Sequence, residues 1–79
     1  MLVSLNKNVW LWEWIKENWE DDLFKILNQN PPYYSKPNGL IKEVATLLKN
    51  KGYKAATNGK DIIIVMKEEE FIFLKLKYS

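Results

Sequence analysis

The sequence of 79 residues contains no cysteine, no histidine and no arginine. Without cysteine it has no disulfide, no thiolate nucleophile and no sulfur ligand for a metal. Without histidine it lacks the commonest general base, the commonest metal ligand and the side chain that titrates near neutral pH. All twelve basic residues are lysine, so no planar guanidinium is present to bind a phosphate or a guanine edge through two hydrogen bonds.

The acidic residues form two clusters, Glu20-Asp21-Asp22 and Glu68-Glu69-Glu70. Neighbouring positions on a helix point about 100° apart, so the first cluster does not converge on one ion. The second is expected on a tight turn, where it lacks the alternating ligands and the glycine of a calcium loop. The glycine-rich phosphate-binding motifs are also missing from the sequence. We therefore expect a protein that is not an enzyme and that holds no cofactor and no metal.

Long hydrophobic runs are missing too. The longest are residues 62–66 and 71–74, far short of the roughly 20 residues of a membrane span. Residues 1–5 are too short for the core of a signal peptide. We expect one small domain, residues 1–79, located in the cytoplasm. Lysine, asparagine and isoleucine supply 27 residues, a usage that AT-rich codons favour, so we expect an AT-rich bacterium, archaeon, phage or plasmid as the source.

Hydrophobic spacing predicts two helices. The first covers residues 9–28 and carries an apolar stripe of Trp12, Ile15, Trp19, Leu23 and Ile26 at spacings of three and four. A loop with three prolines follows over residues 29–38. The second helix covers residues 39–51, with Gly52 in the position of a left-handed residue after its end. Residues 2–5 are compatible with a short strand or with a frayed lead-in.

The remainder predicts three β-strands, over residues 53–57, 60–67 and 70–78. Asn58-Gly59 is typical of a two-residue hairpin turn, and Glu68-Glu69 is expected to form the second turn. The predicted fold class is therefore α+β, with two helices followed by a three-stranded antiparallel meander, in the order α-α-β-β-β.

The predicted sheet is apolar on both faces, whereas a sheet with one wet face alternates apolar and polar residues. Seven residues form one face: Tyr53, Ala55, Ile62, Ile64, Met66, Phe71 and Phe73. Five residues form the other: Ile63, Val65, Ile72, Leu74 and Leu76. Either the two helices cover opposite faces, or both cover one face and the second is left for an interface with a protein partner, most simply another copy in a homodimer.

The first predicted helix offers a second candidate interface. Trp10 and Trp14 lie nearly opposite the Trp12–Trp19 stripe on a helical wheel. They either pack beneath the proline-rich loop or the N-terminal residues, or form an exposed ridge that binds a partner, since tryptophan is enriched at the centres of interfaces.

The charge distribution suggests an alternative function. Residues 9–28 carry a net charge of −3, with two lysines and five acids, and residues 36–60 carry +5, with six lysines and one acid. Weak, salt-sensitive nucleic-acid binding by these lysines and two stacking tyrosines is therefore an alternative. Its candidate residues are Tyr33, Tyr34, Lys36, Lys42, Lys49, Lys51 and Lys54.

A helix ending in Leu-Leu-Lys-Asn-Lys-Gly-Tyr, followed by a predicted meander, resembles the helix-then-sheet half of HicA-like toxins, which have a double-stranded-RNA-binding-like fold. The resemblance covers residues 40–78. The family's catalytic histidine is missing and its closing C-terminal helix is not expected, so the resemblance implies a fold and not the RNase activity. The preferred expectation is an interaction protein, such as an accessory or inhibitor protein of a mobile element.

Overall fold

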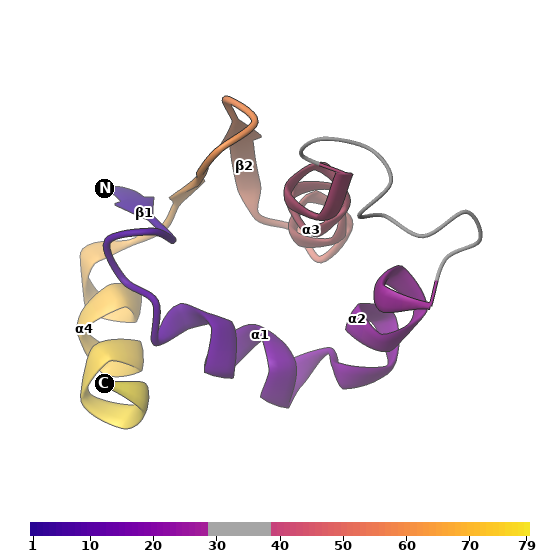
Figure 1. The fold of residues 1–79 in the computed structure, drawn as a ribbon. Coiled ribbons are helices and arrows are strands. Elements are labelled where there is room, and N and C mark those ends of the chain that lie inside the picture. Colours follow the sequence, from indigo (N-terminus) through magenta and orange to yellow (C-terminus); the bar gives the residue numbers. More distant parts are fainter. Residues whose placement is uncertain (29–38) are drawn as a thin grey trace.

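The computed structural model describes residues 1–28 and 39–79, which form a mixed α+β structure (Figure 1). A short strand comes first, three helices follow, then two strands and a last helix. The elements are β1 (Leu2–Ser4), α1 (Leu11–Asn18), α2 (Glu20–Leu27), α3 (Gly39–Asn50), β2 (Lys54–Thr57), β3 (Ile62–Val65) and α4 (Glu68–Tyr78). The α+β content is confirmed, but the predicted order α-α-β-β-β is wrong.

The sheet is antiparallel, with strand order β1-β3-β2. The N-terminal strand takes the edge position that was predicted for residues 70–78, pairing Leu2 with Val65 and Ser4 with Ile63. Val3 and Leu5 are buried in the core. Burial of these two side chains explains why this segment forms a strand, over Leu2–Ser4, rather than a frayed lead-in.

The hairpin between β2 and β3 is longer than expected. Thr57 pairs with Ile62, so the loop has four residues and not two. Asn58 holds it through its Oδ1, which accepts hydrogen bonds from the backbone N–H groups of Lys60 (2.9 Å) and Asp61 (3.0 Å). Gly59 adopts a φ of +92°, a conformation that glycine reaches without steric cost. The register differs from the expected one by two residues, which leaves every side chain on its predicted face.

The predicted helix over residues 9–28 is broken into α1 and α2 at Trp19, where φ is −136° and ψ is 45°. The Nδ2 of Asn18 donates to the carbonyl of Trp14 (2.8 Å) at the end of α1. The break turns Trp14 and Trp19 toward each other and toward Tyr53, with ring centroids 5.1, 5.3 and 6.1 Å apart. In one continuous helix Trp14 and Trp19 would point about 140° apart, so this aromatic cluster requires the interruption.

The helix predicted over residues 39–51 is confirmed as α3, and its end has the expected geometry. Gly52 has a φ of +96°, and the N–H of Tyr53 donates to the carbonyl of Leu48 (3.0 Å). Val44 and Leu48 are buried on the side of α3 that faces the core, and α3 contacts β2.

The C-terminal residues form helix α4 and not a strand, so the expectation that no helix closes the chain's C-terminal half is wrong. Three glutamates occupy its first turn and two lysines its last, which favours a helix because its N-terminus carries partial positive charge and its C-terminus partial negative charge. Phe71, Leu74 and Tyr78 have the spacing of one helical face and pack against or within the core.

One hydrophobic core joins all the described elements except β2, whose Ala55 packs against it. Its fully buried members come from strands, helices and connecting residues: Val3, Leu5, Leu11, Ile15, Val44, Leu48, Ile62 and Ile64. Within residues 1–28 and 39–79, no helix has the length and apolar character needed to cross a membrane.

Candidate protein-binding surface

Helix α4 is apolar on two opposite sides. Its inner side is fixed to the rest of the molecule through Leu74, which is buried, and Phe71, whose ring centroid lies 5.7 Å from that of Trp10. Its outer side carries Ile72, Phe73 and Leu76, which are 49, 64 and 83% exposed. We call these three residues the α4 stripe. At 100° per residue they lie within about 100° of helix circumference.

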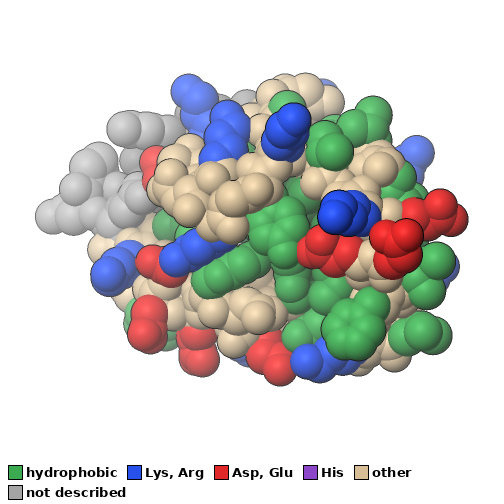
Figure 2. Space-filling view, turned by 180° about the vertical axis from the view of Figure 1, so that it is seen from behind, with side chains coloured by type: hydrophobic (Ala, Val, Ile, Leu, Met, Phe, Trp, Pro, Cys, Tyr) green, Lys and Arg blue, Asp and Glu red, His purple; other side chains and the backbone are tan. Residues whose placement is uncertain are grey.

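The surface around the α4 stripe is shallow. Ile72 and Leu76 line a small hollow together with Lys75 and Ser79. Figure 2 shows hydrophobic side chains reaching the surface on the side where α4 lies, with acidic side chains beside them. Exposed apolar side chains that gather beside polar ones can mark an interaction surface.

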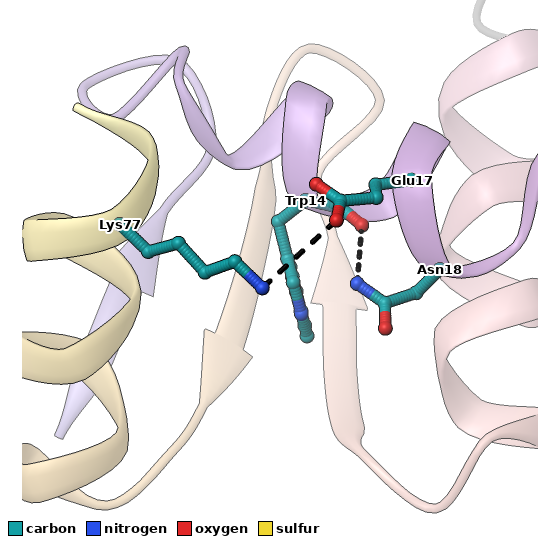
Figure 3. A network of polar contacts seen from close by, with 4 residues as sticks. All are labelled: Trp14, Glu17, Asn18 and Lys77. Atoms are coloured by element: carbon teal, nitrogen blue, oxygen red, sulfur yellow. Dashed lines mark hydrogen bonds and ion pairs between the residues drawn. The ribbon is translucent and has the colours of Figure 1, made fainter.

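Polar contacts fix the position of α4. The Tyr53 hydroxyl donates to Glu70 Oε1 (2.7 Å), joining the start of α4 to the residue before β2. Burial of the hydroxyl, followed by this hydrogen bond and the negative charge of Glu70, raises the pKa of Tyr53 to about 12. At the other end, Lys77 Nζ lies 3.9 Å from Glu17 of α1 (Figure 3). The Lys77 contact is long and joins two exposed side chains, so α4 is held mainly by the Tyr53–Glu70 hydrogen bond and by the buried Leu74.

The sheet carries a second exposed apolar area. The outer sheet face consists of the side chains that alternate away from the core: Leu2, Ser4, Lys54, Ala56, Ile63 and Val65. Leu2 and Val65 are exposed, and Ile63 is half-buried. Of the five residues predicted to form one sheet face, only Ile63 and Val65 share it. Ile72, Leu74 and Leu76 belong to α4, and there Leu74 points inward while Ile72 and Leu76 point outward.

The exposed ridge predicted from Trp10 and Trp14 is wrong. Trp14 is only 4% exposed and points from α1 toward the strands (Figure 3). Trp10 is half-buried against Phe71. Trp12 and Trp19, which the wheel for a single long helix placed on the apolar stripe, are both only partly buried.

The lysines proposed to bind nucleic acid lie on different elements of the structure. Lys42 and Lys49 are exposed on α3, and Lys54 is exposed on the outer sheet face. Lys51 instead forms a 3.0 Å ion pair with Asp22 of the acidic helix α2. Tyr33, Tyr34 and Lys36 lie outside the described residues.

A group of hydrogen bonds around Asp61 holds residues near the N-terminus against the β2–β3 hairpin. The Ser4 hydroxyl donates to Asp61 Oδ2, and the N–H groups of Asn6 (3.0 Å) and Ile62 (2.7 Å) donate to Asp61 Oδ1. Ser4 and Lys7 have the Ser-x-x-Lys spacing of some hydrolases, but Lys7 meets the Ser4 oxygen through its backbone N–H. In the described part of the chain, no three acidic side chains gather to hold a metal ion.

Sequence reasoning missed Phe73 as a member of the exposed surface, because it placed that residue on the opposite face of a strand. The signal was in the sequence. Phe71, Leu74 and Tyr78 are spaced as on a helix, and the segment begins with three glutamates and ends with two lysines. Alternation of apolar residues over 72–76 concealed this pattern.

Comparison of the chain with protein-family models, with curated proteins and with solved structures finds no match.

Proposed function

We propose that this protein is a non-enzymatic interaction module and that the α4 stripe is its contact surface. The observation that carries the proposal is the exposure of Ile72, Phe73 and Leu76 on a helix whose opposite side is anchored in the core. A helix that displays apolar side chains on its exposed side can fill an apolar groove of a partner or pair with another helix. An accessory or inhibitor protein of a mobile element would act in this way.

The experiment is affinity capture from a lysate of the source organism with three forms of the protein. They are the native chain, the double variant Phe73→Glu/Leu76→Glu, and the control variant Phe24→Glu, which charges an equally exposed ring on α2. We expect the native chain and the control to retain the same protein and the double variant to lose it. If all three forms capture the same proteins, the α4 stripe is not the contact surface.

The dependence of binding on salt concentration distinguishes this proposal from nucleic-acid binding. Nucleic-acid binding is favoured by Lys42 and Lys49, because both are exposed and lie seven residues apart on α3. Binding through phosphate contacts weakens steeply as salt rises, whereas binding through the α4 stripe should change little. Binding that is lost in Lys42→Glu/Lys49→Glu and kept in Phe73→Glu/Leu76→Glu would favour nucleic acid.

A further inference from the structure

The charges that flank the α4 stripe are arranged symmetrically about the middle of helix α4. Helix α4 runs from Glu68 to Tyr78, so Phe73 is its middle residue. Glu69 lies four residues before Phe73 and Lys77 four residues after it, and positions four apart lie on neighbouring parts of one helix side. The outer side of α4 therefore has an acidic first turn, an apolar middle and a basic last turn.

This arrangement is complementary to itself in one orientation only. Two α4 helices side by side in parallel place glutamate next to glutamate and lysine next to lysine. Two antiparallel helices related by a twofold axis near Phe73 place the acidic start of each beside the basic end of the other. The apolar residues of both copies then meet in the middle, as an isologous interface requires.

We propose that a second copy of this chain occupies the α4 stripe, with the two α4 helices antiparallel about a twofold axis near Phe73. This inference rests on the proposed function, because it names the partner of the same surface. Glu69 of one copy lies beside Lys77 of the second copy. Lys77 is available for this contact, since its ion pair with Glu17 is long, at 3.9 Å, and both side chains are more than half exposed.

Two further observations favour a second copy on this surface. The outer sheet face has an exposed lysine, Lys54, but no acidic residue among its side chains, so it lacks this self-complementarity. A chain of 79 residues also buries only about 60% of the surface that its unfolded form exposes, and association is a common way for small domains to bury more.

The first test is the mass of the purified protein in solution, measured by sedimentation equilibrium over a range of concentrations. We expect twice the chain mass of 9.4 kDa, with a dissociation constant that rises about thirtyfold or more in Phe73→Glu/Leu76→Glu, as for hot-spot residues at interfaces. Phe24→Glu should leave the mass unchanged. Circular dichroism checks that both variants stay folded.

The second test is a charge exchange. Glu69→Lys and Lys77→Glu should each weaken the dimer by bringing like charges together. An equimolar mixture of these two variants should form a heterodimer, because both lysines of the first variant then face the two glutamates of the second across the interface. A mixture that stays as weak as the single variants would overturn the antiparallel arrangement.

Other outcomes separate this inference from the proposed function. A native chain that is monomeric at every concentration overturns the dimer. If the same monomer still captures a protein through the α4 stripe, the proposed function stands. A dimer that survives Phe73→Glu/Leu76→Glu but is lost in Leu2→Glu/Val65→Glu places the self-association on the outer sheet face instead, and the inference is wrong.

Discussion

At the scale of single residues, Asp61 accepts hydrogen bonds from residues that are distant in the sequence and from its own neighbour. Its carboxylate accepts hydrogen bonds from Ser4, from the backbone of Asn6 and from the backbone of Ile62. Partial burial alone would raise its pKa, but these hydrogen bonds and the charge of Lys7 lower the pKa of Asp61 below its usual value. The ionised side chain therefore connects the N-terminal strand to the β2–β3 hairpin, across 57 positions of sequence.

Asp61→Asn should reduce the free energy of unfolding at pH 7 by about 1 kcal/mol, the typical value of a hydrogen bond in a protein. Because the pKa of Asp61 is lowered on folding, its stabilisation is complete above the unfolded value of about 3.9 and disappears as the pH falls through the folded value. Urea denaturation at pH 7 and pH 3 measures this. Asp21→Asn, on the exposed side of α2, is the matched control. A difference between Asp61→Asn and the native chain that is the same at both pH values would contradict the account.

Tyr53 gives the stability the opposite dependence on pH. Its pKa is raised to about 12, so between pH 10 and 12 the folded chain keeps a proton that the unfolded chain releases. Stability from the neutral hydroxyl is therefore complete below pH 10 and declines as the pH rises toward 12. Tyr53→Phe should be less stable than the native chain at pH 8, and this gap should narrow at pH 10.5. In Tyr78→Phe the Tyr53–Glu70 hydrogen bond remains, so the free energy of unfolding should fall with rising pH as much as in the native chain. If the free energy of unfolding fell equally with rising pH in the native chain and in Tyr53→Phe, the Tyr53 hydroxyl would not be the cause of the decline.

At the scale of elements, α4 distinguishes the observed fold from the predicted meander. In a strand, Leu74 and Leu76 would lie on one face, and substituting either by alanine would change the free energy of unfolding by a similar amount. In the helix, Leu74 is 6% exposed and Leu76 is 83% exposed. Leu74→Ala should therefore cost about 2–4 kcal/mol of unfolding free energy, and Leu76→Ala less than about 0.5 kcal/mol. Urea denaturation of dilute protein, where association does not contribute, provides the comparison. Similar losses in the two variants would favour a strand.

The elements that could be predicted are those whose signal is local. Helix α3 has its apolar face, its glycine end and its closing Tyr53 contact within one stretch of sequence. The β2–β3 hairpin has Asn58-Gly59 at its turn, and alternation on either side fixed which residues face inward. The sequence therefore predicted the faces of β2 and β3 even though it placed the register two residues away.

The elements that could not be predicted depend on contacts between distant residues. Strand β1 forms because residues Leu2 to Ser4 pair with β3, which lies more than 55 positions later in the sequence. The break at Trp19 exists because Trp14 and Trp19 both pack against Tyr53. Once β1 fills the edge of the sheet, residues 70–78 are free to follow their helical spacing. The candidate site changed accordingly. It keeps Ile72 and Leu76 and gains Phe73, while Trp10, Trp14 and Leu74 pack inward and Ile63 and Val65 lie on the separate outer sheet face.

At the scale of the whole molecule, the arrangement of the aromatic residues allows the folding of α1, α2 and α4 to be followed together. Trp14 and Trp19 report on the contact of α1 and α2 with Tyr53, and Trp10 reports on the contact with Phe71 of α4. These contacts surround a single core to which β1, α1, α2, α3, β3 and α4 each contribute a buried side chain. The core is continuous, so no helix should unfold while the others remain in place.

We therefore expect tryptophan fluorescence and far-ultraviolet circular dichroism to give the same urea midpoint, as in two-state unfolding of a small domain. The variant Phe73→Glu/Leu76→Glu should show the same coincidence, since it changes exposed side chains and leaves the core intact. Its midpoint should not vary with protein concentration, whereas that of the native chain should rise with concentration if the native chain is a dimer. Fluorescence that changes at lower urea than the circular dichroism signal would mean that the contacts of α1 with Tyr53 and α4 break before the helices unfold.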